Sequence, residues 1–268
     1  MKRLYIALVL IATFHNAFSK EKKSVENKDY YFDGKISRNV LENYLARSST
    51  FGSLLHLTLE DDLRMIKNTG VKFAGRAIWM WGGESKIDEL VRVGEPFAKK
   101  VHAIDPDIIL QGAIFEIVSK DVESVKIPPE VFKAFEVPQK VRNFDYEAML
   151  YPFGHRHNHW SKGSSVPDMS RLETRMWFFY VAKRWIDMGI EAIHFGQVEI
   201  MDDWDRSHRH WRDMMQKIRD YATKNARRHM VLTDAHVPSG GIVHKGKLMF
   251  DLHSFPSRPK SVKGQPYK

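Results

Sequence analysis

The sequence predicts a parallel α/β domain that is barrel-like, and three observations carry this prediction. Apolar runs typical of buried strands alternate with amphipathic helical patterns along the chain. No strand-like run is followed by the glycine-rich phosphate loop of an open nucleotide-binding sheet. Polar and aromatic residues follow every predicted strand, as in a barrel whose site lies at the carboxyl ends of its strands.

The chain divides into three parts. It has 268 residues, 43% of them hydrophobic, which suits one large domain. Residues 1–19 combine a basic start, the apolar run LYIALVLIATF and small residues before position 20, so they predict a signal peptide. An uncleaved membrane anchor is the alternative, but the run is shorter than the roughly 20 residues of a span. Residues 20–50 predict an N-terminal extension, and residues 51–268 the barrel-like domain. We therefore expect a secreted or periplasmic protein with no membrane segment after cleavage.

The elements of the domain follow from its periodicity. Helical patterns cover residues 58–70, 85–102, 170–188 and 211–222. We expect Gly94 and Pro96 to kink or interrupt the second helix. Strand-like runs cover residues 71–83, 107–118, 190–196, 229–236 and 247–255. A long irregular insert separates the second run from the third and ends in YPFGHRHNHW; it is too aromatic for a linker, so we expect it to cover part of the domain.

The number of strands leaves the closure of the barrel open. A closed (β/α)8 barrel of the TIM-barrel type has eight strands, and five are evident. Either further strands lie in irregular segments such as residues 30–57, or the barrel is incomplete.

Composition excludes several classes of protein. The chain has no cysteine, so it forms no disulfide and uses no thiol chemistry. Its formal charge of +9 is concentrated in short basic runs near the termini and at a helix end, where solvated faces are the usual explanation. No nucleic-acid-binding motif accompanies these runs, so we expect no nucleic-acid partner.

Every predicted strand ends in residues that can take part in chemistry. Taken singly, each could be a capping or paired residue, but buried ionisable groups are costly unless they are paired or used. Their recurrence at five strand ends therefore predicts one site. The residues are Trp79 and Trp81, Glu116, His194 with Glu199 and Trp204 after it, Asp234 with His236, and Asp251 with His253.

The signal peptide, Glu199, IWMWGG, TDAHVPSGG and FDLHSFP together resemble secreted TIM-barrel proteins of the glycoside hydrolase type, over about residues 58–259. The resemblance implies a carbohydrate substrate, two strand-end carboxylates and tryptophans that stack on sugars. Glu199, with apolar neighbours in the sequence, is then the first catalytic carboxylate, with Glu116 or Asp234 as its partner. The substrate-binding residues would be Trp79, Trp81, His194, Trp204, His236, Asp251 and His253. The chain lacks the adjacent Asn-Glu pair of many such barrels, and late strands that would carry a nucleophile are not evident.

Two alternatives remain open. The first is a metal-dependent hydrolase or isomerase on the same barrel, in which a divalent metal is bound by ligands drawn from His155, His157, His159, His236, His253, Asp234 and Asp251. No HExxH motif supports it, and the main prediction has no cofactor. The second alternative is a carbohydrate-binding protein that has the aromatic cleft but no catalysis.

Overall fold

The core of the protein is one parallel sheet. The computed structural model describes residues 29–51, 59–254 and 264–265. Six strands form this sheet in the order β1-β2-β3-β6-β7-β10, and every neighbouring pair is parallel. The strands are β1 (Ser48–Thr50), β2 (Phe73–Ile78), β3 (Ile109–Ile114), β6 (Ala192–Gln197), β7 (Leu232–His236) and β10 (Leu252–His253).

The strand order identifies the architecture. Each new strand joins the sheet beside the previous one, so the order in space is the order in the chain. A doubly wound sheet reverses its order at a switch point, whereas a barrel adds strands in one direction only. The predicted parallel α/β, barrel-like fold of the TIM-barrel type is therefore confirmed. Within the described residues the barrel is incomplete, because the curled sheet has six strands.

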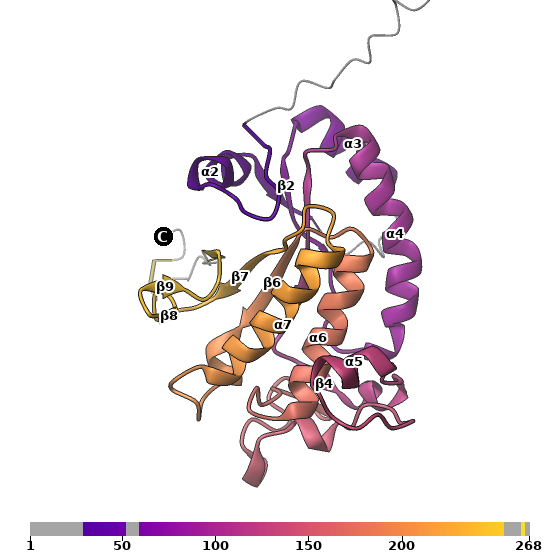
Figure 1. Ribbon diagram of the computed structural model, residues 1–268, viewed down its shortest axis with the longest axis vertical. Helices are drawn as coiled ribbons and strands as arrows, with labels where there is room; N and C mark the ends of the chain where they lie inside the picture. The colour runs from indigo at the N-terminus through magenta and orange to yellow at the C-terminus, as the bar shows by residue number, and fades with distance from the viewer. Residues whose placement is uncertain (1–28, 52–58, 255–263, 266–268) are drawn as a thin grey trace, which may run out of the picture.

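One face of the sheet is covered by helices α3 (Leu59–Thr69), α4 (Ile87–Ile104), α6 (Leu172–Asp187) and α7 (Arg209–Asn225). Figure 1 shows α4, α6 and α7 running alongside the strands. Glycines allow these helices to pack closely on the strands. A Cβ on Gly112 of β3 would lie only 2.8 Å from the Trp185 ring of α6. A Cβ on Gly94 of α4 would likewise lie 2.8 Å from the Ile78 side chain of β2. α4 continues through Pro96, so the expectation of an interrupted helix is wrong.

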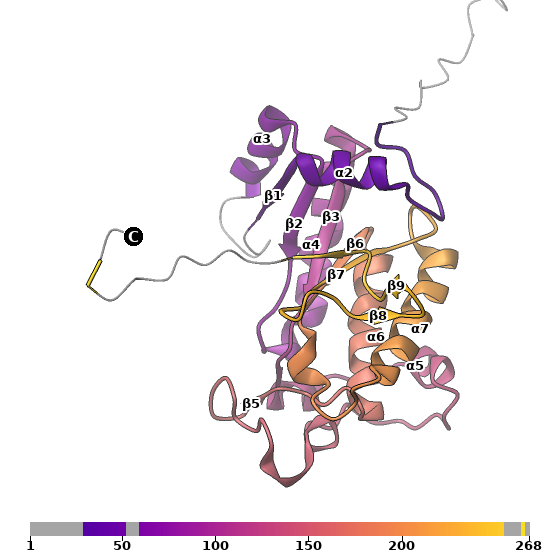
Figure 2. The ribbon, with the colours of Figure 1, turned by 90° about the vertical axis from the view of Figure 1, so that its left-hand side faces the viewer.

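The other, concave face is closed at the amino ends of the strands by residues 29–46. Helix α2 (Arg38–Ala46) packs Tyr44 against Phe73, Ile109 and neighbouring apolar residues. In Figures 1 and 2, α2 lies at the upper end of the sheet. Strand β1 follows directly and forms the sheet edge, so one further strand does lie within residues 30–57, a possibility that the sequence left open. The sheet thus begins before the domain boundary expected at residue 51.

Other predicted elements differ in detail. Of the fifth predicted strand, only β10 joins the main sheet, while Lys247–Leu248 (β9) pairs antiparallel with Val243–His244 (β8). The insert folds into a two-stranded ribbon of β4 (Val118–Ser119) and β5 (Ser164–Ser165) and the short helix α5 (Pro129–Ala134). It lies at the lower end of the sheet in Figure 2, opposite α2. The predicted signal peptide lies outside the described residues.

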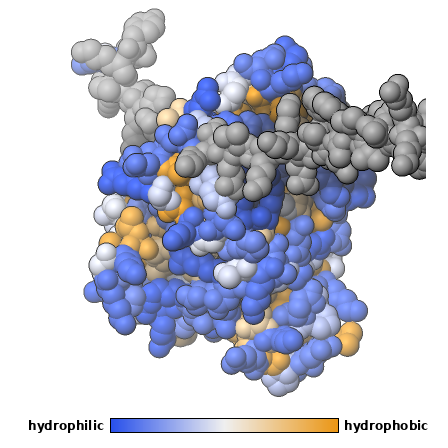
Figure 3. Space-filling view, turned by 45° about the horizontal axis from the view of Figure 1, so that its top comes forward, coloured by the Kyte–Doolittle hydropathy of each residue, from blue (hydrophilic) through white to orange (hydrophobic). Residues whose placement is uncertain are grey.

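The face shown in Figure 3 is mainly hydrophilic, with hydrophobic residues in small separate areas. In the part of the chain that the structure describes, no helix has both the length and the apolarity to cross a membrane.

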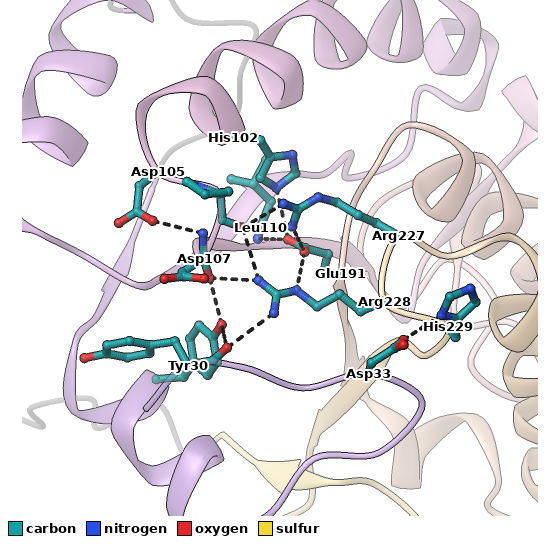
Figure 4. A network of polar contacts seen from close by, with 12 residues as sticks. Tyr30, Asp33, His102, Asp105, Asp107, Leu110, Glu191, Arg227, Arg228 and His229 are labelled. Carbon is teal, nitrogen blue, oxygen red and sulfur yellow. Dashed lines mark hydrogen bonds and ion pairs between the residues drawn. The ribbon is translucent and has the colours of Figure 1, made fainter. Parts of the chain in front are cut away.

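A buried charge joins the strands at their amino ends. The side chain of Glu191, the residue before β6, is 1% exposed and accepts hydrogen bonds from Arg227 (2.6 Å), Arg228 (2.9 Å) and His102 (3.0 Å) (Figure 4). Burial alone raises the pKa of this carboxyl, but the hydrogen bond from His102 and the charges of His102 and both arginines hold it below its usual value.

Arg228 extends this network to the N-terminal segment. Its guanidinium donates to the backbone oxygens of Tyr30 and Asp107 at 3.3 Å and 3.2 Å (Figure 4). The Tyr44 hydroxyl lies 2.6 Å and 2.8 Å from the same two oxygens. Residues 29–46 are therefore attached to the sheet by polar contacts as well as by apolar packing.

Glu191→Gln is expected to lower the free energy of unfolding by about 3–5 kcal/mol, because it leaves buried cations without their counter-charge. Chemical denaturation at neutral pH measures the effect. The matched control is Glu42→Gln, which removes an exposed pair with Arg38 and should change stability by less than about 0.5 kcal/mol. Equal effects of the two substitutions would contradict the role given to Glu191.

Candidate functional site

A cavity of about 660 Å³ opens at the carboxyl ends of the strands. This is the end at which parallel α/β folds carry their sites. Strand ends β1, β2, β3, β6 and β7 all contribute to its wall, together with one residue of the insert. The lining residues are Thr50, Phe51, Arg76, Trp79, Trp81, Phe115, Glu116, Trp160, His194, Gly196, Gln197 and His236.

Aromatic rings form one wall of the cavity. Trp81 is 44% exposed and lies between Phe115 and Trp160, with ring centroids 5.4 Å and 4.9 Å away. Trp79 contacts Phe115 edge to face at 5.7 Å. Trp160 belongs to the insert, and its indole N–H donates to the backbone oxygen of Glu116 at 2.9 Å. The insert thus contributes Trp160 to the cavity wall.

Glu116 is the carboxylate in this wall. Its side chain is buried, with the residue 3% exposed. Oε2 accepts from the backbone N–H of Gln197 at 2.8 Å, and Oε1 from the Gln197 side-chain amide at 2.7 Å. Gly196 makes room for it, because a Cβ at that position would overlap Oε2. β3 and β6 together therefore fix the carboxylate.

A polar layer lies deeper on the concave face. Asp234 of β7 accepts from Gln111 of β3 at 2.6 Å and from His194 Nδ1 of β6 at 2.9 Å. The Arg76 guanidinium of β2 contacts His194 Nε2 at 3.3 Å. These four residues line a second cavity of about 450 Å³, which shares Thr50, Arg76 and His194 with the first.

Arginine determines which nitrogen of His194 carries the proton. A guanidinium can only donate hydrogen bonds, so Nε2 accepts from Arg76. The ring proton then lies on Nδ1, which donates to Asp234. The contacts at both ring nitrogens set the orientation of the imidazole.

The structure brings many of the predicted site residues to these cavities. Trp79, Trp81, Glu116, His194 and His236 line the first, and Asp234 and His253 line the second, together with His194.

Three predicted residues lie elsewhere. Glu199, on the turn Val198–Met201 after β6, is half-buried and accepts a hydrogen bond from the backbone N–H of Ser239 at 3.3 Å. Trp204 is 53% exposed and stacks on His155. Asp251 accepts two hydrogen bonds from Thr233, both at 2.8 Å, and so attaches β10 to β7. The lining of the two cavities includes none of the three.

The acidic loop after β6 has structural roles. Asp205 accepts from the first backbone N–H groups of α7, at Arg209 (2.8 Å) and His210 (3.2 Å), which is a capping arrangement. Asp203 is paired with Arg156 and His155 of the insert. Asp202, 5% exposed, accepts from His208 at 2.5 Å.

The histidines do not converge as the metal-dependent alternative requires. His155 contacts Asp203, His157 donates to the backbone oxygen of Tyr151, and His159 packs against Trp160. Across residues 29–51, 59–254 and 264–265, no three His, Asp or Glu side chains are grouped so as to hold a metal ion.

Sequence reasoning missed several residues of the site. Arg76 lies within a strand, at a bulge, so it is not a strand-end residue. Gln111 and Gln197 are amides without a motif, and the position of Trp160 depends on how the insert folds back. Phe115 was detectable, because it stands beside Glu116 at the end of β3.

Gly196→Ala is expected to displace the Glu116 carboxylate and to destabilise the protein by about 1–3 kcal/mol. A double-mutant cycle measured by chemical denaturation isolates the contact. In a Glu116→Ala background the clash is gone, so Gly196→Ala should cost clearly less there. If Gly196→Ala lowered the free energy of unfolding equally in both backgrounds, Gly196 would not determine the position of the Glu116 carboxylate.

Asp202 is expected to make stability fall as pH rises from about 4 to 7. Burial raises its pKa to about 7, against the opposing hydrogen bond from His208. The unfolded carboxyl, with a pKa of about 3.9, loses its proton first, so rising pH favours unfolding. Asp202→Asn removes this effect. The free energy of unfolding of the variant, relative to the wild type, should therefore grow by roughly 1–3 kcal/mol between pH 4 and 7.

Asp203→Asn is the matched control for denaturation curves at several pH values. Burial opposes ionisation of Asp203, but the hydrogen bonds from Arg156 and His155 prevail and lower its pKa. Asp203 therefore stabilises the protein above pH 4, and this contribution is lost as pH falls through its folded pKa. The variant should lose relative stability as pH rises through about 4, the opposite sign to Asp202→Asn. Parallel curves for the two variants would contradict both assignments.

Comparison with known proteins finds only distant similarity. No family model and no curated protein matches the chain. Structures of the debranching enzyme from Nostoc punctiforme match with TM-scores of 0.40, 0.41 (acarbose soaked) and 0.39 (native form), at 12%, 13% and 13% identity. The matches cover 69%, 75% and 69% of this chain and 39%, 44% and 39% of those chains. The chain therefore spans less than half of their length, and similarity at this level assigns no activity.

Proposed function

We propose that the protein is a carbohydrate-acting hydrolase of the glycosidase type. The observation that carries the proposal is a buried carboxylate, Glu116, in the wall of a tryptophan-lined cavity at the carboxyl ends of parallel strands. Sugars bind proteins through the apolar faces of their rings and through their hydroxyl groups. The cavity offers rings in Trp79, Trp81 and Trp160, and polar groups in Gln197 and the histidines.

The proposed chemistry uses two carboxylates. Glycosidases place one carboxylic acid at the leaving oxygen and one carboxylate at the sugar carbon or at the attacking water. Glu116 suits the second role, because the donors of Gln197 hold it as an acceptor. Glu199, two residues beyond Gln197, and Asp234, on the neighbouring strand, are the candidates for the acid. His194, fixed by Asp234 and Arg76, would orient a sugar hydroxyl.

We propose further that the protein is exported and acts on its substrate in the periplasm or outside the cell. Residues 1–19 support this proposal by their pattern alone. N-terminal sequencing of protein recovered from the producing cells tests it: a mature chain should begin at Lys20.

A second candidate is a carbohydrate-binding protein without turnover. Both oxygens of Glu116 and both of Asp234 already accept hydrogen bonds within the protein, which favours a fixed recognition surface. The two candidates share the ligand class and differ in turnover. Binding of oligosaccharides without hydrolysis would select the second candidate.

Glu116→Gln should reduce hydrolysis by at least about a hundredfold while saccharide binding survives, because it keeps the shape and removes the carboxylate. Hydrolysis is measured on a panel of nitrophenyl glycosides and oligosaccharides, and binding by calorimetry. The matched control is Glu84→Gln. Glu84 is also buried, at 2% exposure, but accepts from Ser119, and neither residue lines the cavity, so this variant should retain activity once folded. Unchanged hydrolysis in Glu116→Gln would reject the proposal.

The same assay separates the remaining possibilities. A hundredfold loss in Glu199→Gln would identify Glu199 as the acid, and retention of activity would leave Asp234, tested by Asp234→Asn. Loss of wild-type turnover on adding a chelator, with recovery on adding zinc or manganese, would support the metal-dependent alternative instead.

A further inference from the structure

Arg76 occupies an unusual backbone position in β2. Its φ is 53°, a left-handed conformation that costs a long side chain on the order of 1 kcal/mol or more. The register between β2 and β3 shifts between Ala74 and Ile78, so Arg76 sits in a bulge. The bulge turns its side chain to the concave face, where it lines both cavities. Bulges that redirect a side chain in this way are common beside active sites.

The charge of Arg76 has no carboxylate partner among the described residues. Its guanidinium contacts Nε2 of His194 at 3.3 Å and lies 5.6 Å from the ring centre of Phe115. Arg142 and Arg228, by contrast, are paired with carboxylates: Arg142 donates to both oxygens of Glu173, and Arg228 donates to Glu191. A guanidinium offers five donors and stays charged at any physiological pH.

The carboxylates of the cavity walls do not neutralise this charge by contact. Glu116 is held by Gln197, and Asp234 by Gln111 and His194. A neutral sugar filling the cavity would remove water from the Arg76 cation without replacing its hydrogen bonds, which is costly. An anionic substituent on the sugar would replace them with charge-assisted bonds.

We propose that the cavity selects an acidic sugar, and that Arg76 binds its negatively charged group. This inference rests on the proposed function, because it takes carbohydrate as the ligand class. A carboxylate or a sulfate ester has the planar or tripodal oxygens that a guanidinium binds through two parallel hydrogen bonds. The aromatic wall of Trp79 and Trp81 holds the ring beside that group. The formal charge, +9 for the full chain and 9 − 2 = +7 without Lys2 and Arg3 of residues 1–19, favours approach of an acidic polymer.

Paired saccharides that differ only in charge test the proposal on the full chain. One pair is an oligogalacturonate and its methyl ester, and the other a sulfated galactan oligosaccharide and its desulfated form. Calorimetry and tryptophan fluorescence measure their affinities. One charged member should bind at least about tenfold more tightly than its neutral counterpart. The preference should shrink at high salt. The pair that shows it identifies the anion as carboxylate or sulfate.

Variants assign the preference to Arg76. Arg76→Gln should weaken binding of the charged saccharide at least about tenfold more than binding of the neutral one, and Arg76→Lys should retain part of the preference. The control is Arg64→Gln, which removes an exposed arginine of α3 paired with Asp61 and should keep the full preference. Circular dichroism and thermal unfolding confirm that each variant is folded. If Arg76 only oriented His194, Arg76→Gln would weaken charged and neutral ligands equally, which would overturn the proposal.

The outcomes separate this inference from the proposed function. Equal wild-type affinity for both members of each pair, with Glu116-dependent hydrolysis intact, would reject only the selection of acidic sugars. Binding of no saccharide, charged or neutral, would reject the proposed function and this inference together.

Discussion

The fold depends on one buried negative charge at the amino ends of the strands. Glu191 stands just before β6, near the middle of the sheet, and collects donors from α4 and from the segment before β7. Arg228 carries the connection on to Tyr30 and Asp107, so the residues that close the concave face are attached through the same network. Breaking such a group would leave several buried charges without partners at once, which is costly.

Buried charged side chains have different partners at the two ends of the sheet. At the amino ends, each buried ion has an opposite charge in contact, so these residues can do little besides hold the strands together. At the carboxyl ends, Glu116 is held by amides, and Arg76 contacts an imidazole. Ions without counter-charges are unfavourable for stability, and they persist where a ligand supplies the missing partner.

Much of the fold could be predicted from the sequence, because β2, β3, β6 and β7 are apolar runs long enough to identify alone. β1 could not, since Ser48–Thr50 is polar and its pairing partner is distant in the chain. The strand-end rule located Glu116, His194 and the tryptophans. Glu199 lies on the loop after Gln197, half-buried and outside the lining of the two cavities, and its catalytic role stays a prediction. The strand-end rule missed Arg76, because a bulge breaks the alternation of faces on which sequence patterns rest.

The shortness of the outer strands has a consequence for pairing with other chains. An incomplete barrel leaves two sheet edges, and an unpaired edge is a template on which another chain can add a strand and start an aggregate. In the described part of this chain, the edge strands are Ser48–Thr50 and Leu252–His253, three and two residues long. So few backbone groups give an incoming strand little to pair with. Within the described residues, the two open edges therefore present only a small template for strand addition.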